Sequence, residues 1–294
     1  MFIYFFLITV GLFAGLIGST IGIGGGILIV PILSLALKIP IHAAIGTSIV
    51  AVLATSVAAS RHFIKKEITN IPLGMVLEIP TTFGAILGSL SVAYIKSNIL
   101  FAIFGIFVFV AGLFTFLKNR SKKDFILPKN AGGSLNENHD TNKPAQKAHS
   151  AIFDLGYYEE TLKKHIDYHV VKLPAGLSLS FFAGIFSGLL GIGGGIIKVP
   201  ALNVIMGVPL KAATATSNFM IGITAVVSSI IYFYNGYINP MITILVVFGV
   251  LIGSTFGSFI AGKLRISNIA FIILAVFSVI GILMFLRAFN MLIY

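Results

Sequence analysis

The sequence contains no cysteine, so neither disulfide bonds nor thiol chemistry contributes to its structure or function. Charged residues are also scarce. They make up 10% of the 294 residues, whereas a soluble domain carries roughly 25%. Hydrophobic residues make up 57%, and the mean hydropathy is +1.03. This composition predicts an integral membrane protein built from helices.

The few charges are mostly positive, with 20 lysine and arginine residues against 9 acidic residues. In a membrane protein such an excess lies mostly in short loops and sets the orientation across the bilayer. We therefore expect contact with the lipid bilayer and no nucleic-acid partner. The sequence contains no signature of a zinc protease, a serine hydrolase or a nucleotide-binding loop, so we expect no enzyme activity, no cofactor and no metal.

A glycine-rich stretch occurs twice, with Gly22 and Gly191 at equivalent places 169 positions apart. It reads IGIGGGILIVP at 21–31 and LGIGGGIIKVP at 190–200. The same offset aligns, without a gap, a pair of alanines, a Thr-Ser pair and two glycines: Ala43–Ala44 with Ala212–Ala213, Thr47–Ser48 with Thr216–Ser217, and Gly84 and Gly88 with Gly253 and Gly257. The chain is therefore a duplicated unit.

Each half contains five apolar segments. They are predicted at 2–21, 27–37, 43–64, 73–95 and 100–117, and at 176–190, 196–206, 212–234, 241–261 and 269–286. The segments at 27–37 and 196–206 are too short to cross a core of about 30 Å at about 1.5 Å per residue, so each is a half-helix or spans only with help. The first segment is expected to be a retained helix, because its counterpart recurs inside the chain.

Between the halves the composition becomes polar and charged. This predicts a first membrane repeat at 1–117, a connecting loop at 118–173 and a second membrane repeat at 174–294. Within the loop, 129–150 is expected to be flexible, and 157–172 contains enough apolar and charged residues to form local structure.

Basic residues predict the topology in the inner membrane. Arg61, Lys65 and Lys66 follow the third segment, and four more basic residues lie at 118–123, so both loops are expected to be cytoplasmic. In the second half the loop at 235–239 has no charge, and the following loop is basic. The halves are therefore predicted to be inverted-topology repeats, an architecture of secondary transporters whose substrate sites lie near the midplane at broken helices.

The glycine loops are the first candidate binding elements: Gly24, Gly25 and Gly26, and Gly193, Gly194 and Gly195. A glycine-rich turn before a helix exposes backbone N–H groups, and the helix dipole adds positive potential there. This arrangement suits an oxyanion. Close packing of helices explains the same glycines without a ligand, because small residues let membrane helices approach each other.

Polar side chains occur at matching positions early in two long apolar segments. They are Thr47 and Ser48 in the first half, and Thr216, Ser217 and Asn218 in the second. Their hydroxyl and amide groups are candidate donors to substrate oxygens. The alternative is hydrogen bonding between helices or back to a carbonyl of the same helix.

Two charged residues lie within apolar segments. Lys198 stands where the other repeat has Ile29, and an intramembrane cation is a functional-site hypothesis because it is costly. It is a candidate to neutralise an anionic substrate, or a lysine that extends its ammonium to the interface. Glu78 is a candidate to carry a coupling proton or to pair with a basic residue, or it is a carboxylate bonded to residues of the cytoplasmic loops.

The two Gly-x-Gly-Gly-Gly-x-x-x-x-Pro stretches, each followed by a Thr-Ser pair, resemble the TauE/SafE family of sulfite exporters and toluenesulfonate uptake permeases. The resemblance covers 8–117 and 175–286. It implies a multi-spanning inner-membrane transporter of a small sulfur-containing oxyanion such as sulfite or an organosulfonate. It also marks Gly24, Gly25, Gly26 and Pro31, and their counterparts Gly193, Gly194, Gly195 and Pro200.

The expected function is therefore secondary transport of such an anion by alternating access, driven by an ion or proton gradient. Two alternatives remain open. One is a passive anion channel with the same fold, and the other is a membrane module whose 118–173 loop binds a cytoplasmic partner.

Overall fold

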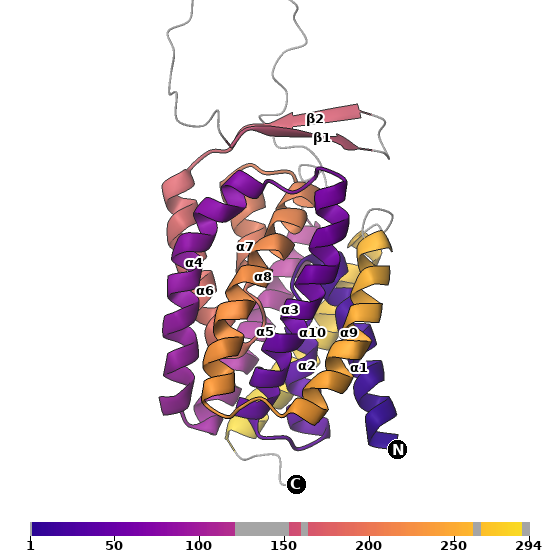
Figure 1. The fold of residues 1–294 in the computed structure, drawn as a ribbon, viewed down its shortest axis with the longest axis vertical. Coiled ribbons are helices and arrows are strands. Elements are labelled where there is room, and N and C mark those ends of the chain that lie inside the picture. Colours follow the sequence, from indigo (N-terminus) through magenta and orange to yellow (C-terminus); the bar gives the residue numbers. More distant parts are fainter. Residues whose placement is uncertain (1, 121–152, 160–163, 261–265, 290–294) are drawn as a thin grey trace, which may run out of the picture.

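The computed structural model describes residues 2–120, 153–159, 164–260 and 266–289, and most of these residues are helical (Figure 1). The first half contains α1 (Phe2–Ile21), α2 (Gly26–Pro31), η1 (Ile32–Ala36), α3 (Ile41–Lys65), α4 (Ile71–Ser91), η2 (Val92–Tyr94) and α5 (Ser97–Arg120). The second half contains α6 (Leu173–Leu190), α7 (Gly195–Pro200), η3 (Ala201–Ile205), α8 (Leu210–Tyr234), α9 (Pro240–Ile260) and α10 (Ile266–Ala288).

Six of these helices are long and apolar enough to cross a membrane, with lengths from 18 to 25 residues. At about 1.5 Å per residue, even the shortest extends about 27 Å, which approaches the thickness of a hydrocarbon core. Every predicted apolar segment contains a helix at nearly the predicted bounds. The protein is therefore an all-α integral membrane protein, as the composition predicts.

The two short segments are broken helices. In each, a six-residue α-helix ends at a proline, Pro31 or Pro200, and continues as a five-residue π-helix. Proline has no N–H to donate to the helical ladder, so it favours such a change of hydrogen-bonding pattern. Helix α3 begins at the end of the bundle where α1 begins (Figure 1). The segment of α2 and η1 therefore folds back instead of crossing the bundle.

Glycines bring the outer helices into close contact. Helix α1 packs along α9, and α4 packs along α6. A Cβ atom on Gly84 or Gly88 would overlap carbonyl oxygens of α6, and one on Gly253 or Gly257 would overlap carbonyl oxygens of α1. Both Gly-x-x-x-Gly pairs are therefore packing motifs, in which small residues let two helices approach closely.

The packing of the first half is repeated in the second. Helix α3 packs against α8 at the centre, and α5 packs against α10. Helix α3 also packs on α9, and its equivalent α8 packs on α4. The equivalent helices α3 and α8 end at opposite ends of the bundle (Figure 1). The inverted orientation of the two halves across a membrane stays a prediction.

A β-hairpin lies over the end of the bundle where α3 ends and α4 begins, which we call the hairpin end (Figure 1). It pairs β1 (Leu155–Glu159) with β2 (Lys164–Tyr168) in antiparallel register. Tyr157 and Tyr168 are buried in a cluster with apolar residues from both halves, including Phe63 and Met206. The expectation of local structure at 157–172 is confirmed, whereas 129–150 lies outside the described residues.

Candidate functional site

The two glycine loops have the same backbone conformation. Gly24 and Gly25 have φ values of 90° and 73°, and Gly193 and Gly194 have φ values of 80° and 70°. This left-handed region is unfavourable for residues with a Cβ atom, which explains why glycine occupies these four positions. Each loop leads directly into one of the broken helices, α2 or α7.

The loops contact each other at the centre of the bundle. A Cβ atom on Gly26 would overlap the carbonyl oxygen of Gly191, and one on Gly195 would overlap the carbonyl oxygen of Gly22. The absence of side chains is therefore what allows the two backbones to meet. The contact is reciprocal, because residues 22 and 26 are equivalent to residues 191 and 195.

Two of the predicted serines join the loops of opposite halves. Ser48 Oγ on α3 donates a hydrogen bond of 2.7 Å to the carbonyl oxygen of Gly191. Its equivalent on α8, Ser217 Oγ, donates a bond of 3.3 Å to the carbonyl oxygen of Gly22. Each serine thus satisfies a carbonyl that the left-handed turn removes from the helical ladder.

The predicted threonines also bond to other helices. Thr47 Oγ1 lies 3.2 Å from Thr243 Oγ1 on α9. Thr216 Oγ1 accepts a bond of 3.0 Å from the backbone N–H of Asn70, at the start of α4. The four hydroxyl residues of the Thr-Ser pairs are buried, and in this conformation each hydrogen-bonds within the protein.

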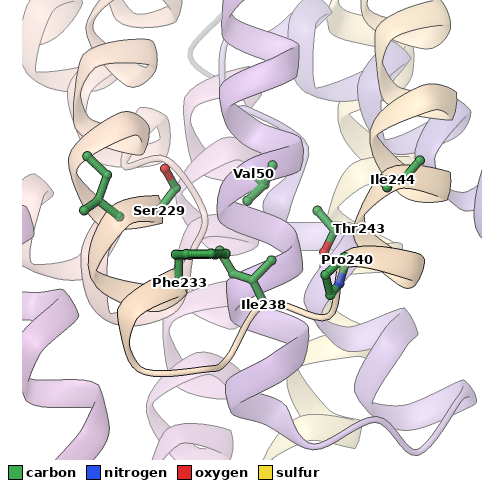
Figure 2. A pocket seen from close by; sticks show the side chains of 8 residues that line it. Val50, Ser229, Phe233, Ile238, Pro240, Thr243 and Ile244 are labelled. Carbon is green, nitrogen blue, oxygen red and sulfur yellow. The ribbon is translucent and has the colours of Figure 1, made fainter.

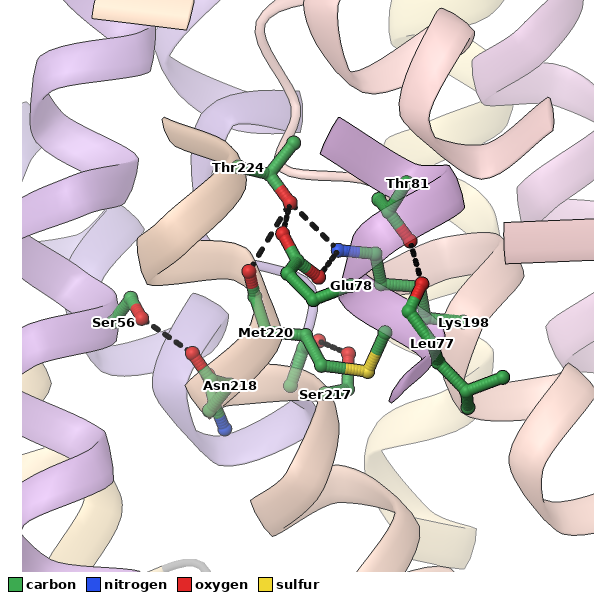
Figure 3. A network of polar contacts seen from close by, with 10 residues as sticks. Ser56, Leu77, Glu78, Thr81, Lys198, Ser217, Asn218, Met220 and Thr224 are labelled. Carbon is green, nitrogen blue, oxygen red and sulfur yellow. Dashed lines mark hydrogen bonds and ion pairs between the residues drawn. The ribbon is translucent and has the colours of Figure 1, made fainter. Parts of the chain in front are cut away.

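Among the predicted site residues, Asn218 has a side-chain group without a hydrogen-bond partner in the part of the chain that the structure describes. Its Nδ2 donates to the carbonyl oxygen of Thr214 at 3.1 Å. Its backbone carbonyl oxygen accepts a hydrogen bond from Ser56 Oγ (Figure 3). Its side-chain Oδ1 is buried and has no hydrogen-bond partner among the described residues. A buried amide oxygen without a donor is costly, which distinguishes Asn218 from the four hydroxyl residues before it.

Glu78, Lys198 and Thr224 form a closed polar triad between three helices (Figure 3). Lys198 Nζ lies 3.3 Å from Glu78 Oε2 and donates a bond of 2.9 Å to Thr224 Oγ1. Thr224 Oγ1 donates to the other carboxylate oxygen, Glu78 Oε1. Lys198 is 2% exposed and Glu78 is 3% exposed, so both charges lie inside the bundle.

The triad corrects two interpretations that the sequence left open. Lys198 does not extend to the interface, because its ammonium is enclosed and paired with a carboxylate. Glu78 does not bond to loop residues, because its partners lie on α7 and α8. Thr224 was missed by the sequence analysis. One threonine within a long apolar helix carries no signal that separates it from its neighbours.

The apolar groove in Figure 2 lies apart from these groups. It has a volume of about 400 Å³ and lies between α3, α8 and α9. Ile230, Phe233 and Ile244 line it and expose more than half of their side chains, which places it on the outer surface of the bundle. It contains none of the predicted site residues, although Thr243, the partner of Thr47, lines it. An anion therefore has no charged or amide group to meet there.

Comparisons with known proteins cover nearly the whole chain. A family model described as "Sulfite exporter TauE/SafE" matches residues 7–284. "Probable membrane transporter protein YunE" of Bacillus subtilis is 28% identical over 94% of this chain and 94% of its own. A probable membrane transporter protein of Methanocaldococcus jannaschii is 28% identical over 95% of this chain and 94% of its own. No solved structure matches.

Proposed function

Because this chain belongs to the sulfite exporter TauE/SafE family of membrane transporters, we propose that it moves a small sulfur-containing oxyanion across the inner membrane by alternating access. Sulfite and organosulfonates are the proposed substrates. The proposal treats 1–117 and 174–294 as two inverted membrane repeats and 118–173 as a cytoplasmic connection. An ion or proton gradient drives transport, with Glu78 as the candidate for coupling.

The reciprocal contact of the two glycine loops is the observation that carries this proposal. Ser48 and Ser217 bond across the boundary between the halves. A movement of one half against the other therefore breaks both bonds together. It would free two hydroxyls beside two loops whose backbone N–H groups suit an oxyanion.

The proposed substrate site combines the loops with the polar groups around them. The groups are Gly24, Gly25, Gly26, Gly193, Gly194 and Gly195, the hydroxyls of Thr47, Ser48, Thr216 and Ser217, and the side chains of Asn218 and Lys198. The side chains are all buried in the described conformation. This conformation is therefore read as a closed state between the two open ones.

Thermal unfolding of the purified protein with a panel of anions tests the proposal. The panel contains sulfite, thiosulfate, sulfate, sulfoacetate, taurine and chloride. A ligand that binds the native state raises its stability by mass action. We expect a shift with one of the sulfur compounds that is lost in Lys198→Ala or Asn218→Ala. No shift with any sulfur compound would contradict the proposal.

Flux measurements in proteoliposomes separate a carrier from a channel. A carrier that alternates between two open states saturates and supports counterflow of labelled anion against unlabelled anion. A flux that rises linearly with concentration and shows no counterflow would contradict alternating access. Deletion of residues 129–150 is the control for the connecting loop, because transport by the two repeats should survive it.

A further inference from the structure

We propose that the Glu78 carboxylate occupies, in the closed state, the place that the substrate anion takes on Lys198 and Thr224, and that the displaced carboxylate binds one proton. The inference rests on the proposed function and deepens it. It assigns the coupling ion, adds Thr224 to the substrate-binding residues and favours a monovalent anion.

The triad already holds an anion between two donors. One carboxylate oxygen of Glu78 faces Lys198 Nζ, and the other accepts from Thr224 Oγ1. A sulfonate or sulfite group presents two oxygens in a similar way to one ammonium and one hydroxyl. The Glu78 carboxylate therefore has the chemistry of the proposed substrate and is held by groups that suit it.

Of the two contacts that Lys198 makes in the triad, the one to Glu78 is the longer. The Lys198–Glu78 distance is 3.3 Å, whereas the Lys198–Thr224 bond is 2.9 Å. Charge-assisted bonds between nitrogen and oxygen are commonly about 2.7–2.9 Å. The ammonium therefore lies closer to the threonine than to the carboxylate, so that Lys198 can keep its bond to Thr224 while its anionic partner is exchanged.

The fold does not require these charges. The positions equivalent to Lys198 and Glu78 are Ile29 and Val247, and the position equivalent to Thr224 is Thr55. Thr55 Oγ1 donates to the carbonyl oxygen of Ala51 at 3.0 Å, and Thr224 Oγ1, which donates to Glu78, lies at a similar distance of 3.1 Å from the carbonyl oxygen of Met220. The equivalent threonine therefore has the same position relative to its own helix with and without the ion pair. A buried ion pair is weak support for stability, which leaves a functional reason for the pair.

Charge balance then requires a proton. With Glu78 ionised and Lys198 protonated the triad is neutral, and one bound anion would add an uncompensated negative charge inside the bundle. Isolated buried charges are so costly that a titratable group becomes neutral instead. The Glu78 carboxylate and one proton from solution form a carboxylic acid, no other bond changes, and the site is neutral again.

The surrounding helices offer few other groups that could compensate the charge. Helices α4 and α7 carry no ionisable residue besides Glu78 and Lys198, and α6, which packs along α4, carries none. On α8 the ionisable residues are Lys211 in the first turn and Tyr232 and Tyr234 in the last. Thr224 lies between them, so the proton is assigned to Glu78.

Proton uptake on anion binding tests this exchange in the unmodified protein. Methanesulfonate and sulfate are suitable probes, because their charges do not change near neutral pH. We expect the weakly buffered, detergent-purified protein to take up one proton for each methanesulfonate that binds, and sulfate to bind more weakly. Binding of either anion without proton uptake would overturn the exchange and leave the proposed transport function standing. If no sulfur anion binds at all, the proposed function fails first.

The two partners of the ion pair should respond with opposite signs. Glu78→Gln removes the competing carboxylate, so we expect methanesulfonate to bind at least about tenfold more tightly, whereas Lys198→Gln should abolish binding. A pair with only a structural role would change binding in the same direction in both variants. That result would contradict the exchange.

Thr224→Val and Thr55→Val form a matched pair for the hydroxyl. Both remove a buried threonine hydroxyl whose oxygen lies about 3 Å from the carbonyl oxygen four residues back in its own helix. Only Thr224 is assigned to the anion, so its loss should weaken methanesulfonate binding about tenfold, and Thr55→Val should leave binding unchanged. Equal effects would place the anion elsewhere.

Discussion

The two halves of this protein share a packing scheme but differ in charge at one pair of equivalent places. In the second half, the broken helix carries Lys198, which faces Glu78 and Thr224. In the first half the equivalent residues are Ile29, Val247 and Thr55. The helices that carry these residues pack in equivalent pairs, so the same architecture occurs with and without the charges. In the proposed mechanism, the shared packing belongs to the architecture and the charged residues belong to anion transport.

The largest expected change in stability comes from breaking the ion pair of Lys198 and Glu78 while the equivalent residues of the other half are kept. Lys198→Met should lower the free energy of unfolding by about 3–5 kcal/mol, because it leaves the Glu78 carboxylate buried without its ammonium. Ile29→Met, the control at the equivalent position, should cost less than about 1.5 kcal/mol. Denaturant or thermal unfolding in detergent measures both.

Replacing the ion pair by the apolar residues of the equivalent positions tests the same comparison more sharply. The double variant Glu78→Val with Lys198→Ile copies the residues of the uncharged place and should unfold with a free energy within about 1 kcal/mol of the unmodified protein or above it. Anion binding should be lost. A double variant as unstable as Lys198→Met would show that the two places are not structurally equivalent.

The glycine loops should respond alike, because their contacts are reciprocal. Gly26→Ala and Gly195→Ala each place a methyl group against a carbonyl oxygen of the opposite loop. Overpacking of this kind costs about 1–3 kcal/mol, and the melting temperatures of the two variants should fall by similar amounts. A fall in one variant only would contradict the equivalence of the loops.

The helix caps at the two ends provide a smaller test. Asn70 caps α4 and Asn239 caps α9, but Asn70 Nδ2 also donates to the carbonyl of Phe153 at 2.8 Å and to the Tyr168 hydroxyl at 3.2 Å. Asn239→Ala should cost about 1 kcal/mol at most. Asn70→Ala should cost about 1 kcal/mol more and speed proteolysis of the connecting segment. Equal proteolysis in both variants would show that Asn70 does not hold the hairpin.

The smallest effect concerns only the hairpin end and appears at alkaline pH. Burial raises the pKa of Tyr168 from its usual 10.0 to about 12, although the hydrogen bond from Asn70 acts to lower it. The protonated tyrosine therefore favours the folded hairpin, and this contribution is complete below pH 10 and is lost as pH rises through about 12. Limited proteolysis between pH 9 and 11 should show the onset of this loss above pH 10, and Tyr168→Phe should reduce the pH dependence.

Hydrophobic runs predict most of this fold because their length and composition are local properties of the chain. The ten apolar segments and the two broken helices follow from run length, glycine and proline. The hairpin was expected only as local structure, because its strands owe their position to Tyr157 and Tyr168 packing on helices far away in the sequence.

The candidate site shows where the sequence stops being informative. The duplication points to Ser48 and Ser217, but it does not indicate that each reaches the loop of the other half. Glu78 and Lys198 are 120 positions apart, and nothing in their local patterns pairs them. Such contacts depend on the rotation and register of helices, which a single sequence does not specify.

The glycine loops also limit how such a protein can evolve. A codon change at Gly26 or Gly195 adds a side chain where the opposite backbone already lies, so the centre offers little room for inherited variation. We expect differences in substrate preference to arise at positions around the glycine loops, where the residues of the two halves already differ. Positions 29 and 198 are such a pair, because one half has isoleucine and the other has lysine.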